Sequence, residues 1–456
     1  MNKPLLLKFI VMGFITLLLL VPLSLIHSMI QERGAYRNSV MANIASSTSR
    51  DQLLVGPVMV VPYTKTVTQW RKTENDKGVD AYTSKQNGQL FFLPETLKVA
   101  VQMKTELRKR GIYQATLYHA AINMRGTFKL PQDYGIVEGL ESYTFQTPFL
   151  FMSVSDVRGI KSTIDVRFDG EDKSVAPGTR VAAFSNGVHV PVMQNIDHSE
   201  QADDTAFDLN FRLQGTSRLS ILQLGKETEI AMTSDWPHPS FQGNYLPSTH
   251  EIGERGFSAN WYSSHFANNV HQYLPVCARA QRCEDLMASA AQVALIHPVD
   301  HYVKSNRAIK YALLFVGLTF AGFFLFEVMK QLKIHPVQYS LVGISLAAFY
   351  LLLISLSEHI GFVWAYIVSA AACIFLLGFY LVNVLQSAKR AWLFALSLGL
   401  LYALLYGVLD SEDYALLMGA ILLFAVLSVF MIATRKLDWY VAAKEYFPQD
   451  KQGKVT

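Results

Sequence analysis

Six long apolar stretches constrain this chain more than any other feature of its sequence. One lies near the N-terminus, and the other five follow one another closely in the C-terminal third. Each has about the 20-residue length of a helix that crosses the ~30 Å hydrocarbon core of a membrane. A long, mostly polar segment separates the first stretch from the rest. The stretches cover residues 9–29, 311–329, 337–356, 360–382, 391–409 and 414–434.

The sequence therefore predicts an α-helical membrane protein with six transmembrane helices, arranged as one plus five, and a large water-facing domain. The last five helices have short connections, and lipid tolerates no unpaired backbone, so we expect antiparallel neighbours in one bundle. The predicted domains are residues 1–30 (cytoplasmic tip and first helix), 31–307 (external domain), 308–436 (five-helix bundle) and 437–456 (cytoplasmic tail).

Lysine and arginine near the short loops set the predicted orientation, because cytoplasmic loops are enriched in these residues. The loops after the third and fifth spans are acidic, so both termini are expected in the cytoplasm and residues 31–307 outside. Lys304, Arg307 and Lys310 oppose this orientation, but they belong to a long translocated segment, where the charge rule weakens. The supporting basic positions are Lys3, Lys8, Lys330, Lys333, Lys389, Arg390, Arg435 and Lys436.

The first apolar stretch could instead be a cleaved signal peptide. Such a peptide has an apolar region of about 7–15 residues, followed by a cleavage site of small residues. This stretch is longer and continues into His27-Ser-Met-Ile-Gln31, which offers no such site, so we predict an uncleaved anchor. The net charge of +4 gives no indication of nucleic-acid binding.

Residues 31–307 show mostly two-residue alternation, which is typical of half-buried strands. Phe207, Leu209, Phe211 and Leu213 alternate with polar residues, and similar runs occur at 111–126 and 226–232. Turn-forming residues separate such runs. The pattern predicts a β-rich external domain that is antiparallel and sandwich-like. Turns are predicted at 75–78, 86–88, 169–170, 177–178 and 185–187, and helices at 32–52 and 284–295.

Cys277 and Cys283 lie close together in the external domain. An oxidising compartment favours a disulfide between them. Free thiols remain an alternative, and so does a zinc site with His265 and His271, although their spacing is not that of a zinc finger. The third cysteine, Cys373, lies in the middle of a span, where a lone thiol usually acts as a small apolar residue.

The chain contains no G-x-S-x-G, H-E-x-x-H or P-loop motif. It is therefore not expected to be an enzyme or to hold a cofactor or a metal ion. Its densest polar and aromatic cluster is residues 233–241. Two prolines could stiffen a binding loop that presents Asp235, Trp236 and His238 to a partner. Alternatively, a strand ends here and Trp236 fills the core.

Charged residues within membrane spans are costly, so they are functional candidates. Glu327 is expected in the last turn of the second span, where it can reach the cytoplasmic surface. Glu358 and His359 are expected at the turn between the third and fourth spans. A proton relay would bring these two side chains together inside the bundle; otherwise they are solvated or cap the fourth helix. No charge lies at the centre of a span, which weighs against a transporter.

Motifs along nearly the whole chain resemble the CreD family of cell-envelope integrity proteins. The resemblance implies a Gram-negative inner membrane, expression tied to a two-component envelope response, and a role in envelope maintenance, without a defined biochemical activity. The pair Cys277 and Cys283 is not part of this family resemblance. The motifs are Glu32-Arg-Gly-Ala-Tyr-Arg37, Leu54-Val-Gly-Pro57, Asp156-Val-Arg-Gly-Ile160, residues 233–241, Phe266-Ala-Asn-Asn269, His335-Pro-Val-Gln-Tyr339, Leu356-Ser-Glu-His-Ile-Gly-Phe362 and Asp438-Trp-Tyr440.

These observations lead to one functional hypothesis and two alternatives. The hypothesis is a multi-pass inner-membrane protein whose β-rich periplasmic domain supports envelope integrity by binding another envelope component. Its predicted partners are the lipid bilayer and that component. The first alternative is a transporter or lipid-handling protein that uses the five-helix bundle, with Glu327, Glu358 and His359 as its polar groups. The second is a membrane-tethered periplasmic enzyme.

Overall fold

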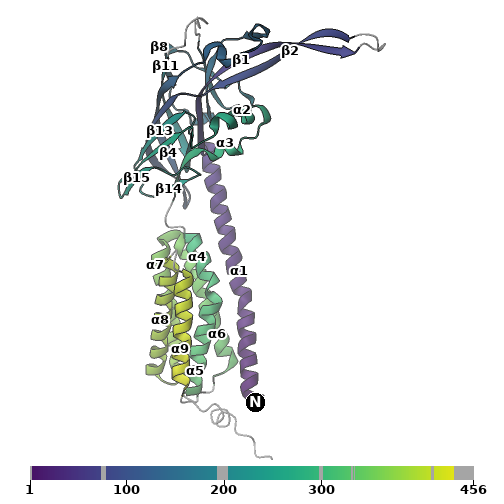
Figure 1. Ribbon diagram of the computed structural model, residues 1–456. Coiled ribbons are helices and arrows are strands. Elements are labelled where there is room, and N and C mark those ends of the chain that lie inside the picture. The colour runs from purple at the N-terminus through teal and green to yellow at the C-terminus, as the bar shows by residue number, and fades with distance from the viewer. Residues whose placement is uncertain are drawn as a thin grey trace, which may run out of the picture. The chain divides into compact units, whose positions relative to one another are not determined.

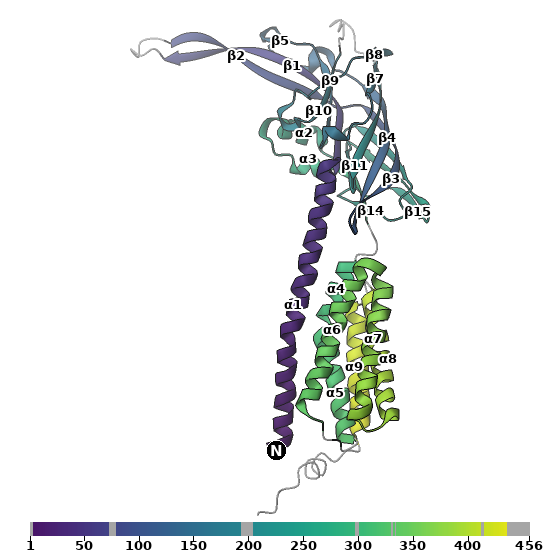
Figure 2. The same ribbon diagram turned by 180° about the vertical axis from the view of Figure 1, so that it is seen from behind.

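The chain forms two compact units. The computed structural model describes residues 3–72, 79–192, 204–296, 301–329, 332, 334–411 and 415–435. The helical unit comprises Met1–Asn38 and Val299–Thr456, and the β-rich unit comprises Ser39–Pro298. Figures 1 and 2 show the helices of the first unit and the sheets of the second from opposite sides.

Long apolar helices make up the helical unit. Among the described residues, α1 and α5 to α8 are long and apolar enough to cross a membrane. The sixth predicted span is also helical, with a shorter apolar run at Leu417–Val429. Together with the β-rich unit, these helices confirm the predicted fold class. The helices are α1 (Lys3–Ser47), α4 (His301–Lys310), α5 (Ala312–Met329), α6 (Pro336–Ile360), α7 (Phe362–Val384), α8 (Ala388–Asp410) and α9 (Ala415–Thr434).

Local sequence signals determine where α6 begins and ends. The His335 imidazole accepts a hydrogen bond from the Val337 N–H, and the Gln338 side chain accepts one from the His335 N–H. Pro336 follows at the first helical position, where its missing N–H has little effect. At the other end, Gly361 has a φ of 80°, a conformation that favours glycine, so α7 can begin directly after α6.

A small residue brings α1 close to α6. A Cβ atom at Gly343 would lie 2.3 Å from Cδ1 of Leu19 and 3.0 Å from Cζ of Phe320. The Leu19 side chain therefore occupies the space that any larger residue at position 343 would need. Such close approach over glycine is typical of packed transmembrane helices.

Two sheets form the β-rich unit (Figure 2). The nine-stranded sheet has the order β14-β17-β12-β1-β6-β10-β9, with β2 and β5 both paired to β1; the eight-stranded sheet has the order β15-β16-β13-β3-β4-β11-β7-β8. Two short helices, α2 (Val270–Ala280) and α3 (Glu284–Ala288), precede the last strand. The strands are β1 (Gln52–Lys72), β2 (Val79–Phe92), β3 (Thr96–Arg110), β4 (Tyr113–Phe128), β5 (Tyr143–Phe145), β6 (Phe149–Val154), β7 (Asp165–Phe168), β8 (Glu171–Lys173), β9 (Ala176–Pro177), β10 (Gly187–Pro191), β11 (Thr205–Thr216), β12 (Arg218–Leu222), β13 (Glu227–Ser234), β14 (Pro239–Gln242), β15 (Thr249–Gly253), β16 (Gly256–Ser264) and β17 (Ala290–Leu295).

Alternating side chains from both sheets build one hydrophobic core. On β11 the side chains of Phe207, Leu209, Phe211 and Leu213 are all buried, as the sequence predicted, while Arg212 between them is exposed. Because successive side chains of a strand point to opposite faces, the eight-stranded sheet keeps a second, polar face outside this core.

Three features of the β-rich unit differ from the sequence prediction. First, the sheets are not purely antiparallel, since β1 runs parallel to β12 and β13 runs parallel to β3. Second, residues 86–88 form no turn; they continue β2, where Gly88 lies beneath the ring of Tyr63. Third, residues 284–295 are helical only in α3, and the rest forms β17, whose buried residues pair with β12 and β14 on either side.

β1 and β2 continue beyond the rest of their sheet as a two-stranded ribbon (Figures 1 and 2). Their pairing extends from Met59 opposite Phe92 to Lys72 opposite Val79. β5 accompanies β1 only as far as Lys65. Beyond that point, within the described part of the chain, the two strands pair only with each other. The turn predicted at 75–78 lies outside the described residues.

The C-terminal end of α1 is held by a side-chain network in the β-rich unit. The Asp156 carboxylate accepts hydrogen bonds from the backbone N–H and the guanidinium of Arg158 and, at 3.4 Å, from the Arg50 N–H. Arg158 in turn donates to the carbonyl oxygen of Ser46 at 2.7 Å. The predicted helix at 32–52 thus continues α1 as far as Ser47, and the chain enters β1 at Gln52.

Candidate functional sites

The loop at residues 235–238 is built around a buried tryptophan. Trp236 is 9% exposed, and its indole N–H donates to the carbonyl oxygens of His238 at 3.1 Å and of Ile296 at 3.0 Å. His238 is exposed, whereas the Asp235 carboxylate accepts hydrogen bonds from the N–H and hydroxyl of Thr105, both at 2.9 Å. This geometry corresponds to the packing alternative for Trp236, because its ring is not available to a partner.

Beside this loop, the open face of the eight-stranded sheet carries a hollow of about 800 Å³. Its floor is a row of residues that face each other across four neighbouring strands: Thr233 on β13, Gln102 on β3, Ala121 on β4 and Arg212 on β11. Ala121, in the middle of this row, has a small side chain and so leaves space above the sheet. A second hollow of about 480 Å³ shares Gln102, Ala121 and Arg212 and extends the first along the sheet.

Four cations line the larger hollow, which we call the basic groove: Lys104, Lys161, Arg212 and Arg255. All four are exposed, and none forms a salt bridge with another residue of the described part of the chain. Asp235 is the one carboxylate among the described lining residues, and it keeps its charge because its donor, Thr105, is neutral; Glu106, outside the lining, lies 3.1 Å from His119 Nε2. The groove therefore has a local excess of positive charge.

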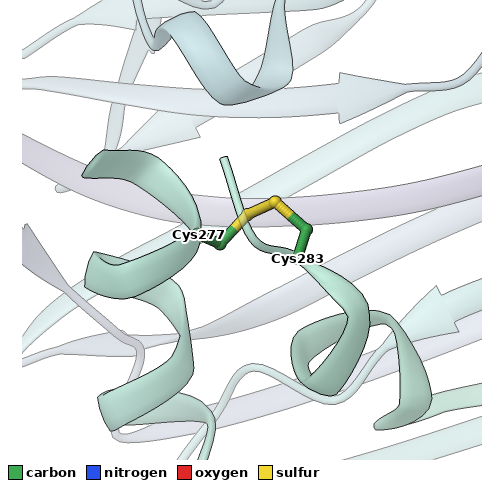
Figure 3. Close-up of a disulfide and its surroundings, with 2 residues drawn as sticks. All are labelled: Cys277 and Cys283. Carbon is green, nitrogen blue, oxygen red and sulfur yellow. A yellow bond between two sulfur atoms is a disulfide. The ribbon is translucent and has the colours of Figure 1, made fainter. Parts of the chain in front are cut away.

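Cys277 and Cys283 are joined by a disulfide in the structure (Figure 3). The bond links the last turns of α2 to the start of α3, and Cys277 is fully buried in the hydrophobic core. With both sulfurs bonded to each other, neither serves as a zinc ligand. Among the described residues, no group of three or more His, Cys, Asp or Glu side chains is arranged to hold a metal ion.

Glu327 lies in the last turn of α5 and is fully buried within the helical unit. It forms an ion pair with Lys8 of α1. It also accepts hydrogen bonds from the Tyr339 hydroxyl at 2.8 Å and from the Ile334 N–H at 3.0 Å. The expectation that Glu327 extends toward the membrane surface is therefore wrong, because these partners hold its carboxylate inside the helix packing.

Glu358 and His359 point in different directions at the end of α6. Glu358 accepts a hydrogen bond from the Tyr302 hydroxyl at 2.8 Å, and its carboxylate lies 3.8 Å from Arg33 of α1. His359 is exposed. Successive residues on a helix are separated by more than a quarter of a turn. The two side chains therefore do not meet, as a proton relay between them would require.

The partners of the two buried carboxylates could not be identified from the sequence. Lys8 and Arg33 lie on α1, more than three hundred residues before the acids that they contact. Their spacing along α1 was the available clue, since each lies near one end of the first apolar stretch. The basic groove was also missed, because its cations come from separate strands and loops.

Most of the chain is similar to one family of membrane proteins. A family model described as inner membrane protein CreD matches residues 4–440. Inner membrane protein CreD of Escherichia coli (strain K12) is 38% identical over 424 residues, which cover 93% of this chain and 91% of that protein. Among solved structures, a mutant M1 zinc metallopeptidase from Deinococcus radiodurans, bound to a Tyr-Ser-Ala substrate, covers 38% of this chain and 39% of its own. At 7% identity and a TM-score of 0.19, that similarity supports no inference.

Proposed function

Because this chain belongs to the CreD family of inner-membrane proteins, we propose that it supports the integrity of the cell envelope by binding an anionic envelope component. The binding site is the basic groove, and the β-rich unit that carries it lies in the periplasm. Both chain termini are cytoplasmic in this proposal, and the helices anchor the β-rich unit to the membrane.

The observation that carries the proposal is the unpaired charge of the basic groove. A protein surface usually mixes charges of both signs, and a concave site lined by one sign attracts ligands of the opposite sign. One hollow brings together four cations, Lys104, Lys161, Arg212 and Arg255, against a single carboxylate among the described lining residues, Asp235. An anionic ligand would supply the partners that these cations lack within the described structure.

The floor of the groove suits an extended ligand. Thr233, Gln102 and Ala121 present short or uncharged side chains across three adjacent strands. The second hollow continues this floor past Arg212. A chain-like ligand could therefore lie along the sheet while its anionic groups meet the cations at the sides, and guanidinium groups bind carboxylate or phosphate through paired hydrogen bonds.

The test combines charge reversal with crosslinking in intact cells. In the Lys104→Glu/Arg212→Glu variant, the groove loses its net positive charge, so we expect reduced tolerance of envelope stress at a normal protein level. A photocrosslinking residue at position 102 should capture a component in the wild-type background and lose it in this variant. Both substituted side chains are exposed, so folding should be preserved.

Lys109→Glu is the matched control, because Lys109 is an exposed lysine on the same strand that does not line the groove. It should retain both the adduct and the stress tolerance. Normal tolerance and an unchanged adduct in the charge-reversal variant would refute the role of the groove.

The transporter alternative receives less support from the helical unit. Its buried carboxylates Glu327 and Glu358 each have a cation on α1 and a tyrosine hydroxyl as partners. His359 is exposed and apart from both. If the bundle serves as an anchor, His359→Ala should leave stress tolerance unchanged, whereas a proton relay through this residue would lose it.

A further inference from the structure

A second hollow in the β-rich unit, which we call the α2 cleft, has a volume of about 830 Å³. This volume falls within the range of about 300–1,000 Å³ that is usual for sites of small ligands. Residues from the end of β2, from the segment after β4 and from α2 line it. Its apolar lining consists of Phe91, Phe92, Leu93, Leu130, Pro131, Leu274 and Pro275.

The charged residues of the α2 cleft leave it with a positive character. Lys226 and Glu95 neutralise each other, with Nζ and Oε1 2.5 Å apart. Glu95 is the one carboxylate among the described lining residues. Lys129 remains as an exposed cation, and the imidazoles of His265 and His271, also exposed, line the cleft beside it. The cleft thus combines an apolar wall with a cationic group, which matches a ligand that has an apolar body and an anionic head.

The backbone of two lining segments, 94–95 and 225–226, is already hydrogen-bonded within the β-rich unit. A peptide that adds a strand needs a sheet edge with free N–H and C=O groups. Here the Pro94 carbonyl accepts from the Lys226 N–H, and Glu95 bonds Thr127 and Glu227 through its backbone N–H and carbonyl. The Gly225 N–H donates to the Thr228 hydroxyl. At these two segments, recognition therefore relies on side-chain contact and charge rather than on free backbone groups.

From these three observations, we propose that the α2 cleft binds a single-chain anionic lipid, with the acyl chain against the apolar wall and the head group at Lys129. A fatty acid and a lysophospholipid share this chemistry. The site is separate from the basic groove, as the two share no lining residue.

Photolabelling of the full-length protein tests this proposal. The protein is placed in phosphatidylcholine nanodiscs and irradiated with a diazirine derivative of palmitic acid, and labelled peptides are identified by mass spectrometry. We expect label on residues 91–93, 129–131 and 271–275. Excess palmitate or lysophosphatidylglycerol should compete, and the one that competes at the lower concentration identifies the head group. Uncharged monopalmitoylglycerol should not compete.

Two variants and one control complete the experiment. Lys129→Glu should reduce labelling of the cleft by about tenfold, the effect of losing one charged contact, and Leu93→Trp should reduce it by filling the space. Lys109→Glu should change nothing, and label on the membrane helices provides an internal reference. Label confined to those helices, competition by monopalmitoylglycerol, or unchanged labelling in Lys129→Glu would each overturn the proposal. The charge-reversal variant of the basic groove should label normally, so failure of either proposal is recognised separately.

Discussion

Trp236 illustrates how a residue that looks suited to binding can serve packing instead. Its ring is buried, and its N–H bonds two carbonyl groups, so Trp236→Ala would leave a large cavity and take a donor from each carbonyl, although the His238 carbonyl would still accept from the Ile296 N–H. We expect a loss of about 3–5 kcal/mol in unfolding free energy and little protein in the membrane. His238→Ala removes an exposed ring two residues away and should leave the protein level unchanged. Immunoblots of membrane fractions decide the matter; a normal level of Trp236→Ala would contradict the packing role.

Asp156 should make the stability of the β-rich unit depend on pH. Hydrogen bonds from the Arg158 side chain lower the pKa of Asp156 from 3.8 to about 2. A carboxyl group with a lowered pKa stabilises the fold above its unfolded pKa, and this contribution disappears as pH falls through the folded value. Asp156→Asn should therefore cost on the order of 2 kcal/mol at neutral pH, and its difference from the wild type should shrink as pH falls from 3.8 to about 2.

Thermal unfolding of the full-length protein across this pH range measures the effect of Asp156→Asn. Asp165→Asn is the control, because Asp165 is an exposed carboxylate on β7. It should unfold at the wild-type Tm at every pH. Identical Tm values for Asp156→Asn and the wild type at neutral pH would show that the network at the end of α1 contributes nothing.

At the scale of elements, one ion pair connects α1 to α5. Lys8→Leu would leave the buried Glu327 carboxylate without this cation, and breaking a buried pair from one side costs about 3–5 kcal/mol. The double variant Lys8→Leu/Glu327→Gln should recover much of that loss, because it no longer buries an uncompensated charge. Thermal unfolding in nanodiscs of the wild type, both single variants and the double variant gives the coupling. Additive losses would mean that the two residues act independently.

Helices and strands that are determined by a local hydrophobic pattern could be predicted from the sequence. The membrane helices follow from apolar length, and β11 follows from the alternation of Phe207 to Leu213. Elements decided by distant partners could not be predicted in this way. Ala290–Leu295 has helix-forming alanines, yet it lies between β12 and β14, and burial there outweighs local propensity.

The candidate site was harder to predict than the fold for the same reason. Alternation along β3 and β11 places Lys104 and Arg212 on a polar face, but only the strand order β13-β3-β4-β11 brings them to one hollow. In that order β13 runs parallel to β3. Parallel strands are not joined by a hairpin turn, so no local sequence signal identifies them as neighbours. The loop at 235–238 was found in the sequence, although only Asp235 of its three candidate residues lines the groove.

At the scale of the whole molecule, the orientation in the membrane is the prediction with the widest consequences. The basic loops predict cytoplasmic readings for reporter fusions near Lys333, Lys389 and Lys444. Fusions near Gly170 and Ser411 should read periplasmic. Lys333 and Lys444 lie outside the described residues, so their prediction rests on sequence alone. A cytoplasmic reading at Gly170 would move the basic groove to the wrong side of the membrane for the proposed function.

The ribbon of β1 and β2 has a consequence for how the length of this protein can change. Beyond Lys65 its strands pair only with each other among the described residues, so no other strand sets their extent. Removing two residues from each strand keeps the register and the facing of every remaining side chain, whereas removing one residue from a single strand shifts them all. The reach of this ribbon can therefore vary between related chains in steps of two residues in each strand, while the sheets at its base stay the same.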